Sequence, residues 1–259
     1  MTRALTIAAS DSAAASGVQA DLRVFAARGV YGVCAVTLVA AQDTRAVRRL
    51  YKLPASIVGA QIDTVLRDIG ADACKIGWFR SPELTTLIAG RIRRREIRQV
   101  VLDPCLWSAN GAVLTPPRTV KRLVRELLPC TEVLCVTVRE LSVLAATPIE
   151  TEEELRAAAE RVRSLGARSL VVEDAFGEHP VWAGIGAELQ PVAGRTTGAT
   201  RLTDEGGLFS AALTAALAAG AALPEAARSA AAFVEAARAD AQAPGRGSLV
   251  WSIPDGGVR

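Results

Sequence analysis

The sequence has little that would mark a zinc protein, a secreted protein or a membrane protein. Its 259 residues include a single histidine, His179, and five cysteines that form no Cys-x-x-Cys pair, so a zinc site of the usual spacing cannot be assembled. No run of about 18 apolar residues without charge is present, which argues against a transmembrane helix. The first residues lack the long apolar centre of a signal peptide. We therefore predict a cytoplasmic protein with no membrane partner.

Lysine is also scarce, because Lys52, Lys75 and Lys121 are the only lysines among 30 basic residues and the net charge is +3. The densest basic stretch covers 91–98, Arg-Ile-Arg-Arg-Arg-Glu-Ile-Arg. Such a stretch could bind nucleic acid. No aromatic residues are interleaved to stack on bases, which favours a solvated helix end whose arginines complement the helix dipole. No nucleic-acid partner is predicted.

Apolar runs and helical patterns alternate along the chain. The expected strands cover 4–9, 33–40, 73–76, 99–102, 132–136 and 169–172, followed by a small antiparallel pair at 181–183 and 189–192. The expected helices cover 17–28, 54–69, 82–95, 118–128, 139–145, 152–165, 206–219 and 224–237. This alternation predicts one α/β domain over 1–259, with a mostly parallel sheet and helices on both faces. Residues 245–259 are expected to form a loose tail.

The most informative segment is the first predicted strand-to-helix turn, where open α/β folds bind ligands. It resembles the opening of the hydroxymethylpyrimidine/phosphomethylpyrimidine kinases, a branch of the ribokinase-like superfamily, with alanines where glycines are usual. The matching residues are Ser10, Asp11, Ser12, Gly17, Gln19, Ala20 and Asp21. The resemblance implies a three-layer ribokinase-like fold and substrate contacts from Asp11 and Asp21. An ordinary turn capped by Ser and Asp is the alternative.

The resemblance continues through segments 30–33 and 40–47, and implies that Gln42 hydrogen-bonds an aminopyrimidine ring. An amide suits this role because it offers both a donor and an acceptor. Trp78 follows Lys-Ile-Gly where the family has Met, and is expected either to cover the ring or to be a core aromatic. Asp103 is expected near Mg²⁺ and the phosphates, or as a cap at a strand end.

The predicted nucleotide side departs from the family pattern. Thr137-x-x-Glu140 stands where the family has Asn-x-x-Glu, which implies nucleotide contact by Thr137 and a Mg²⁺ role for Glu140. Glu173 stands where the family carries a lysine, so a positive charge facing the phosphates is reversed.

The largest departure is the anion hole at a helix N-terminus, where the family has Gly-Thr-Gly-Cys. Here Asp204-Glu-Gly-Gly207 takes that position. Gly206 and Gly207 therefore occupy the catalytic motif, and the base position, Gly207, has no side chain. Asp204 or Glu205 could act as base or hold Mg²⁺ in a shifted loop.

Two functions stay open at this point. One is an ATP- and Mg²⁺-dependent kinase acting on a hydroxymethylpyrimidine or its phosphate in thiamin biosynthesis. The other is an inactive paralogue that binds a pyrimidine as a sensor or partner subunit. Loss of a positioned base costs about 10²–10⁴ in rate, so little or no kinase activity is expected. The resemblance also implies a possible homodimer.

Overall fold

A computed structural model describes residues 1–95, 97–108, 111–176, 181–185, 188–193 and 202–253. His179 lies outside these residues. Nine strands form one sheet in the order β3-β2-β1-β4-β5-β6-β7-β8-β9. Their bounds are β1 Arg3–Asp11, β2 Tyr31–Gln42, β3 Val47–Lys52, β4 Ala73–Ile76, β5 Gln99–Leu102, β6 Val133–Thr137, β7 Ser169–Glu173, β8 Val181–Gly184 and β9 Gln190–Ala193.

The sheet is mostly parallel, because every neighbouring pair from β2 through β1, β4, β5 and β6 to β7 runs parallel. The antiparallel pairs lie at its two edges, β2–β3 on one side and β7–β8–β9 on the other. The expected α/β architecture with a mostly parallel sheet is confirmed, and the predicted antiparallel pair at the far edge is present.

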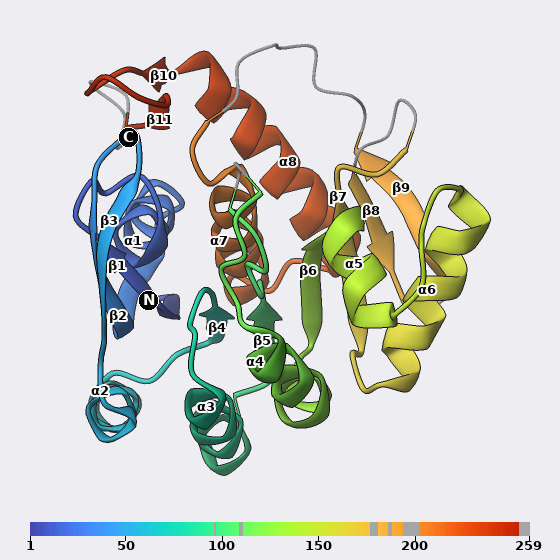
Figure 1. Cartoon of the computed structure of the whole chain (residues 1–259), viewed down its shortest axis with the longest axis horizontal. Helices are drawn as coiled ribbons and strands as arrows, with labels where there is room; N and C mark the ends of the chain where they lie inside the picture. The colour runs from blue at the N-terminus through green and yellow to red at the C-terminus, as the bar shows by residue number, and fades with distance from the viewer. Residues whose placement is uncertain (96, 109–110, 177–180, 186–187, 194–201, 254–259) are drawn as a thin grey trace.

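Helices cover both faces of the sheet (Figure 1). One layer contains α1 Gly17–Ala27, α7 Glu205–Ala218 and α8 Leu223–Ala239. The other contains α2 Ala55–Asp68, α3 Pro82–Arg95, α4 Pro117–Arg122, α5 Val138–Ala145 and α6 Glu152–Ser164. Helix α4 continues as a π-helical turn, Leu123–Leu127, and a 3₁₀ turn, Leu128–Cys130.

Helix α7 runs through the middle of its layer, against β4 and β5 and between α1 and α8. Every residue from Gly207 to Leu217 is buried, as expected of a helix that is apolar all round. Its N-terminus is consequently fixed relative to the carboxyl ends of the central strands. Those strand ends are where ligands bind in open α/β sheets.

Two helices begin with a Thr-x-x-Glu capping box. In α6, Thr151 accepts from the Glu154 backbone while the Glu154 carboxylate accepts from the Thr151 backbone, which is the predicted arrangement. In α5, Thr137 and Glu140 form the same reciprocal pair. Each box satisfies donors that the first helical turn leaves free.

Two features differ from the sequence expectation. Strand β3 was not predicted, because all six of its residues are exposed and the segment has no apolar face. The expected loose tail is attached where the structure describes it: β11 Val250–Trp251 pairs with β10 Ala241–Gln242, and Trp251 is buried. Ser248 and Gly247 also donate to Thr44 at the tip of the β2–β3 hairpin.

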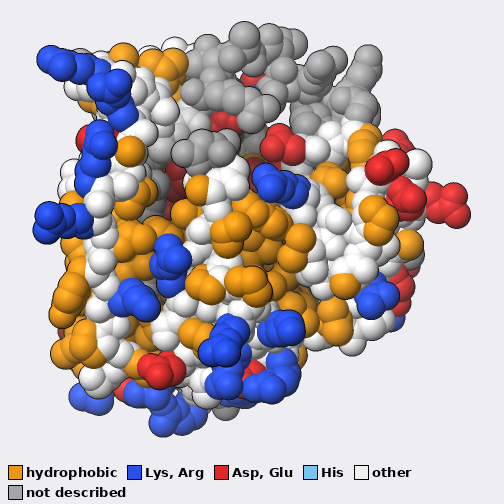
Figure 2. Space-filling model, viewed as in Figure 1, with side chains coloured by type: hydrophobic (Ala, Val, Ile, Leu, Met, Phe, Trp, Pro, Cys, Tyr) orange, Lys and Arg blue, Asp and Glu red, His pale blue; other side chains and the backbone are white. Residues whose placement is uncertain are grey.

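The basic stretch lies at the end of α3, where Lys and Arg side chains gather at the lower edge of Figure 2. Arg91 and Arg95 both pair with Asp63 of α2. These pairs fit the predicted solvated helix end. Within the described residues, no helix has the length and apolar content needed to cross a membrane.

Candidate active site

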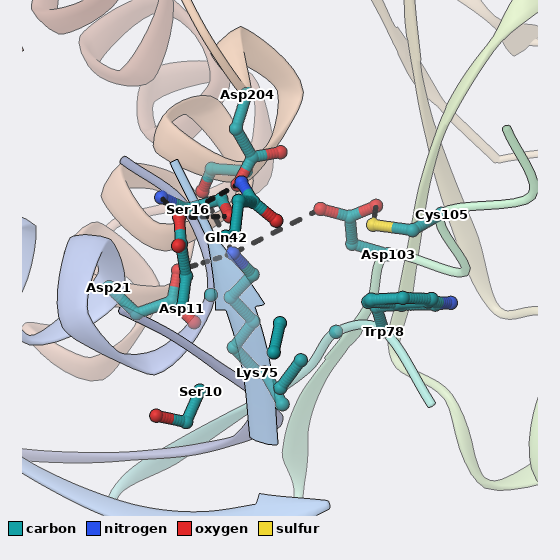
Figure 3. Close-up of a pocket in the computed structure, with 16 residues that line it drawn as sticks. Ser10, Asp11, Ser16, Asp21, Gln42, Lys75, Trp78, Asp103, Cys105 and Asp204 are labelled. Carbon is teal, nitrogen blue, oxygen red and sulfur yellow. Dashed lines mark hydrogen bonds and ion pairs between the residues drawn. The ribbon is translucent and has the colours of Figure 1, made fainter. Parts of the chain in front are cut away.

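The pocket of interest opens at the carboxyl ends of β1, β2, β4 and β5, beside the N-terminus of α7 (Figure 3). Six of the sequence-predicted site residues line it together: Asp11, Asp21, Gln42, Trp78, Asp103 and Gly207. Four others, Thr137, Glu140, Glu173 and Gly206, are not part of its lining. The structure thus brings six of the predicted residues to one pocket and places the other four outside its lining.

Asp11 organises the first loop. Its carboxylate accepts from the backbone N–H groups of Ala13, Ala15 and Ser16 at 2.8, 3.1 and 3.0 Å, and from the Ser16 hydroxyl at 2.9 Å. Gln42 Nε2 donates to the same carboxylate at 3.1 Å. The alternative of a turn-forming Asp therefore describes much of what this side chain does, and its substrate role stays a prediction.

Gln42 is held at the pocket by the same network. Its backbone N–H donates to the Ser12 hydroxyl at 2.9 Å, and that hydroxyl donates to the Gln42 carbonyl at 2.8 Å. Because its amide nitrogen bonds Asp11, the amide is fixed in orientation. Its oxygen is a candidate acceptor for an amino group on a ring.

Trp78 packs beside Ala9, Leu38 and Ala40 at the pocket edge. In Figure 3 the indole lies flat below Asp103 and Cys105, with its nitrogen turned away from Lys75. Both sequence alternatives for Trp78 are compatible with this position, since the side chain belongs to a small apolar cluster and also lines the pocket.

Among the described residues that line the pocket, Lys75 is the only basic one. Its Nζ donates to Asp21 Oδ1 at 2.5 Å and to the Gly207 carbonyl at 2.8 Å, and lies 4.0 Å from Asp103 Oδ2. Burial alone would lower the pKa of Lys75, but the carboxylates of Asp21, Asp103 and Asp204 outweigh burial and raise it. Lys75 is thus a fixed positive charge.

In the sequence, Lys75 belongs to the Lys-Ile-Gly-Trp motif, and no role was predicted for it. Its signal was a lysine inside an apolar strand, a position where a charge requires a partner. That partner, Asp21, is 54 positions away in sequence and also accepts from the Thr6 hydroxyl at 2.5 Å. Asp21 therefore lines the pocket chiefly as the counter-charge of Lys75.

Asp103 ties the end of β5 to α7. Its carboxylate accepts from the Ser210 hydroxyl at 2.6 Å and from the Cys105 thiol at 3.2 Å. Burial, together with the nearby carboxylates of Asp103, Asp204 and Glu140, raises the pKa of Cys105 well above its ordinary value. Cys105 is therefore a neutral thiol and a poor nucleophile.

The start of α7 holds the unexpected feature of the site. Asp204 is the N-cap residue, with φ 58° and ψ 44°, and its side chain makes no capping hydrogen bond. Burial raises the pKa of Asp204 to about 7, with Asp103 and Asp21 adding to the rise and Lys75 and the Gly17 N–H opposing it. Glu205 turns elsewhere, pairing with Arg238 at 2.8 Å.

The predicted nucleotide group lies at the ends of β6 and β7. Glu140 Oε1 accepts from the Leu106 N–H at 2.8 Å and its Oε2 from Thr137 at 3.1 Å, so both oxygens have protein partners. Glu173 accepts from the Cys135 thiol at 3.3 Å. Burial and the charge of Asp103 raise the pKa of Glu173 well above its ordinary value.

A resident metal site is not built from these side chains. Among the described residues, no group of three or more His, Cys, Asp or Glu side chains is arranged to hold a metal ion. The Mg²⁺ role of Glu140 therefore stays a prediction from the resemblance, and no chemical step is assigned to the metal.

Comparison with known proteins gives one family match that spans most of the chain. Residues 11–251 match the family described as phosphomethylpyrimidine kinase. The hydroxymethylpyrimidine/phosphomethylpyrimidine kinase of Synechococcus elongatus is 38% identical over 170 residues, which are 66% of this chain and 64% of that protein. The chain spans from a third to just under two thirds of the length of the curated relatives it matches.

Two solved structures share the whole fold. An ADP complex of Bacillus subtilis pyridoxal kinase superposes with a TM-score of 0.86 at 29% identity, covering 97% of each chain. Phosphomethylpyrimidine kinase from Clostridium difficile 630 gives 0.81 at 28% identity, covering 91% of this chain and 99% of the other.

Proposed function

The chain belongs to the phosphomethylpyrimidine kinase family, and we propose on that premise that it transfers the γ-phosphoryl group of ATP to a hydroxymethyl group on a pyrimidine ring. The observation that carries the proposal is that one pocket contains Gln42, the buried Lys75 and the N-terminus of α7. A ring held at Gln42 would present its hydroxymethyl group toward the helix.

The two sides of the pocket suit the two halves of such a reaction. The first loop and Gln42 form a pre-organised polar wall, which limits the entropy lost on binding a ring. The first N–H groups of α7 point out of the helix and attract the anionic group being transferred. Phosphoryl transfer depends mainly on positioning and charge stabilisation, and the buried Lys75 contributes a fixed positive charge to both.

ATP as the donor is supported by the relatives. The structure of Bacillus subtilis pyridoxal kinase contains bound ADP. A structure of Staphylococcus aureus pyridoxal kinase contains AMP-PCP and pyridoxal. Magnesium would accompany the nucleotide phosphates and neutralise their charge.

The inactive paralogue is the second candidate, and the composition of the α7 start favours it. Gly207 has no side chain, and an ideal Cβ on Gly206 would lie 3.7 Å from Glu173 Oε1, so an acidic side chain faces the helix start. An ionised carboxylate about 5 Å from a phosphate charge would cost roughly 3 kcal/mol at an effective dielectric near 20. The raised pKa of Glu173 reduces this penalty, because a neutral carboxyl group does not repel phosphate.

A coupled ADP-release assay separates the two candidates. The purified protein is supplied with Mg-ATP and 4-amino-5-hydroxymethyl-2-methylpyrimidine, its monophosphate or pyridoxal. Turnover of about 1–100 per second, the usual range for kinases, would support the kinase. Pyrimidine binding in calorimetry without ADP release would support the inactive paralogue, and absence of both would overturn the ring-binding site itself.

A homodimer is part of the same proposal. Val39 and Tyr51 are cross-strand partners in the β2–β3 hairpin and are exposed by 44 and 67%, and exposed apolar side chains at a sheet edge are typical of an interaction surface. Light scattering should give twice the chain mass. Replacing Tyr51 with Lys should return a monomer.

A further inference from the structure

The first turn of α7 contains a carboxylate in the space of a missing side chain. An ideal Cβ built on Gly207 would lie 2.2 Å from Asp204 Oδ2, 2.5 Å from its Cγ and 2.7 Å from its Oδ1. Distances this short mean that the Asp204 carboxylate and any side chain at position 207 exclude each other. The carboxylate therefore occupies the volume that a residue at 207 would use to reach the pocket.

We propose that Asp204, from the residue before α7, is the general base of the phosphoryl transfer in place of residue 207. This rests on the proposed kinase function. The position expected to carry the base, Gly207, lines the pocket, and so does Asp204. The base is moved three residues back along the chain while its carboxylate stays beside the same helical turn.

The backbone explains how Asp204 reaches this place. Its φ of 58° lies in the left-handed region, which Asp adopts more readily than most residues. An N-cap Asp normally accepts from the second or third N–H of its helix, but Asp204 makes no such bond. The Gly17 N–H of α1 bonds to it instead. The first N–H groups of α7 therefore remain available to bind an anionic ligand. The Asp204 carboxylate remains available to accept a proton from the substrate.

The surrounding charges tune Asp204 for proton transfer. The groups that face it are Lys75 of β4, Asp21 of α1 and Asp103 after β5, with the Cys105 thiol nearby. A pKa of about 7 for Asp204 is close to the working pH of a cytosolic enzyme, where a general base is most effective. Lys75 keeps the ionised form from becoming too costly.

The chemical step balances with ATP as the named donor. The substrate hydroxyl oxygen forms a bond to the γ-phosphorus, while the bond from that phosphorus to the bridging oxygen of ADP breaks and its electron pair stays on ADP. The hydroxyl proton moves to an Asp204 carboxylate oxygen and later leaves to water. The products are the phosphate ester, ADP and one proton.

The test compares Asp204→Asn with Glu225→Gln. The Asn side chain keeps an oxygen that can accept from the Gly17 N–H, but cannot take a proton from the substrate. We expect kcat to fall by about 10²–10⁴ with the ring KM changed less than threefold, and the acidic limb near pH 7 to disappear from the kcat profile. Glu225→Gln removes an equal charge from the exposed start of the neighbouring helix α8, away from the pocket lining, and should keep the wild-type profile.

A double variant tests whether Asp204 acts as a base or only supports the local structure. Asp204→Gly combined with Gly207→Asp moves the carboxylate onto the helix, and should recover at least tenfold over Asp204→Asn. Calorimetry with the pyrimidine checks that each variant is folded. Wild-type kcat with an intact acidic limb in Asp204→Asn would overturn this inference alone. A wild-type protein without ADP release would overturn the proposed function and this inference with it.

Discussion

Asp11 and Asp204 line the same pocket but differ in how many hydrogen bonds their carboxylates accept. Asp11 accepts five hydrogen bonds, from three backbone N–H groups, one hydroxyl and the Gln42 amide. Asp204 has the Gly17 N–H, lies among other carboxylates, and has its pKa raised to about 7 by burial. A carboxylate whose oxygens are fully used holds a loop in shape. One that is only partly satisfied stays available for chemistry.

The largest expected effect comes from removing the buried positive charge of Lys75. Lys75→Met leaves Asp21, Asp103 and Asp204 without their positive neighbour, and breaking a buried ion pair typically costs about 3–5 kcal/mol. Urea unfolding should show this loss. Lys121→Met, an exposed residue of α4, should change stability by less than about 0.5 kcal/mol. An equally small change in both variants would contradict the role given to Lys75.

The next effect distinguishes the two aspartates directly. Asp11→Asn replaces one acceptor oxygen with a donor amide, so the Ala13 N–H loses its partner and the donors to the other oxygen lose a charged acceptor. Hydrogen bonds to a charged group contribute about 1.5–3 kcal/mol, and we expect a destabilisation of about 2–3 kcal/mol in urea at pH 8. If Asp11→Asn unfolds like the wild type, the scaffold role of Asp11 is wrong.

Gln42→Ala should weaken pyrimidine binding about tenfold, because one hydrogen bond contributes about 0.5–1.5 kcal/mol. The melting curve of the free protein should change little, since Asp11 keeps four of its partners. Gln61→Ala is the matched control: Gln61 bonds the Val36 N–H and carbonyl, away from the pocket lining, so it should lower stability and leave affinity alone. Calorimetry that finds equal affinities in Gln42→Ala and the wild type would remove the ring assignment.

The last prediction is a pH dependence of stability. The pKa of Asp204 rises from 3.8 to about 7 on folding, so its contribution to stability is fully present below about pH 4 and is lost as the pH rises through 7. Asp204→Asn lacks this titration. The variant should match the wild type near pH 4 and be more stable at pH 8, the opposite of Asp11→Asn. A constant difference across this range would contradict the raised pKa.

Much of the fold was predictable because its local patterns are strong. The parallel strands are apolar on both faces, and Gly and Pro mark the helix ends. The site was less predictable, since it depends on pairs distant in sequence. Lys75 and Asp21 are separated by 54 positions, and no local pattern announces that they meet.

The Thr-x-x-Glu pattern shows a different limit. At Thr151 the pattern predicted a capping box. At Thr137 the family resemblance implied a nucleotide contact and a role in binding Mg²⁺ instead. The structure contains a capping box at both places. The physical demand of a helix start is the same in each, and any ligand role for Thr137 or Glu140 would be additional to it.

Position 204 also could not be interpreted from the order of residues alone. Its alignment with a glycine of the family motif left Asp204 and Glu205 as alternative candidates for a base or for holding Mg²⁺, and the sequence offered no way to choose between them. The left-handed backbone of Asp204 and the position of its carboxylate beside Gly207 are visible only in the structure.

The mutual exclusion of the Asp204 carboxylate and a side chain at 207 also constrains how this lineage could have changed. A carboxylate in this rotamer requires glycine at 207, so the two positions form one evolutionary unit. A lineage that gained Asp204 first would have held the aspartate in another orientation until position 207 became glycine. Among homologues, we expect Asp at 204 to occur with Gly at 207, and a reactive side chain at 207 with a small residue at 204. Scoring either column separately would misjudge which members of the family retain a base.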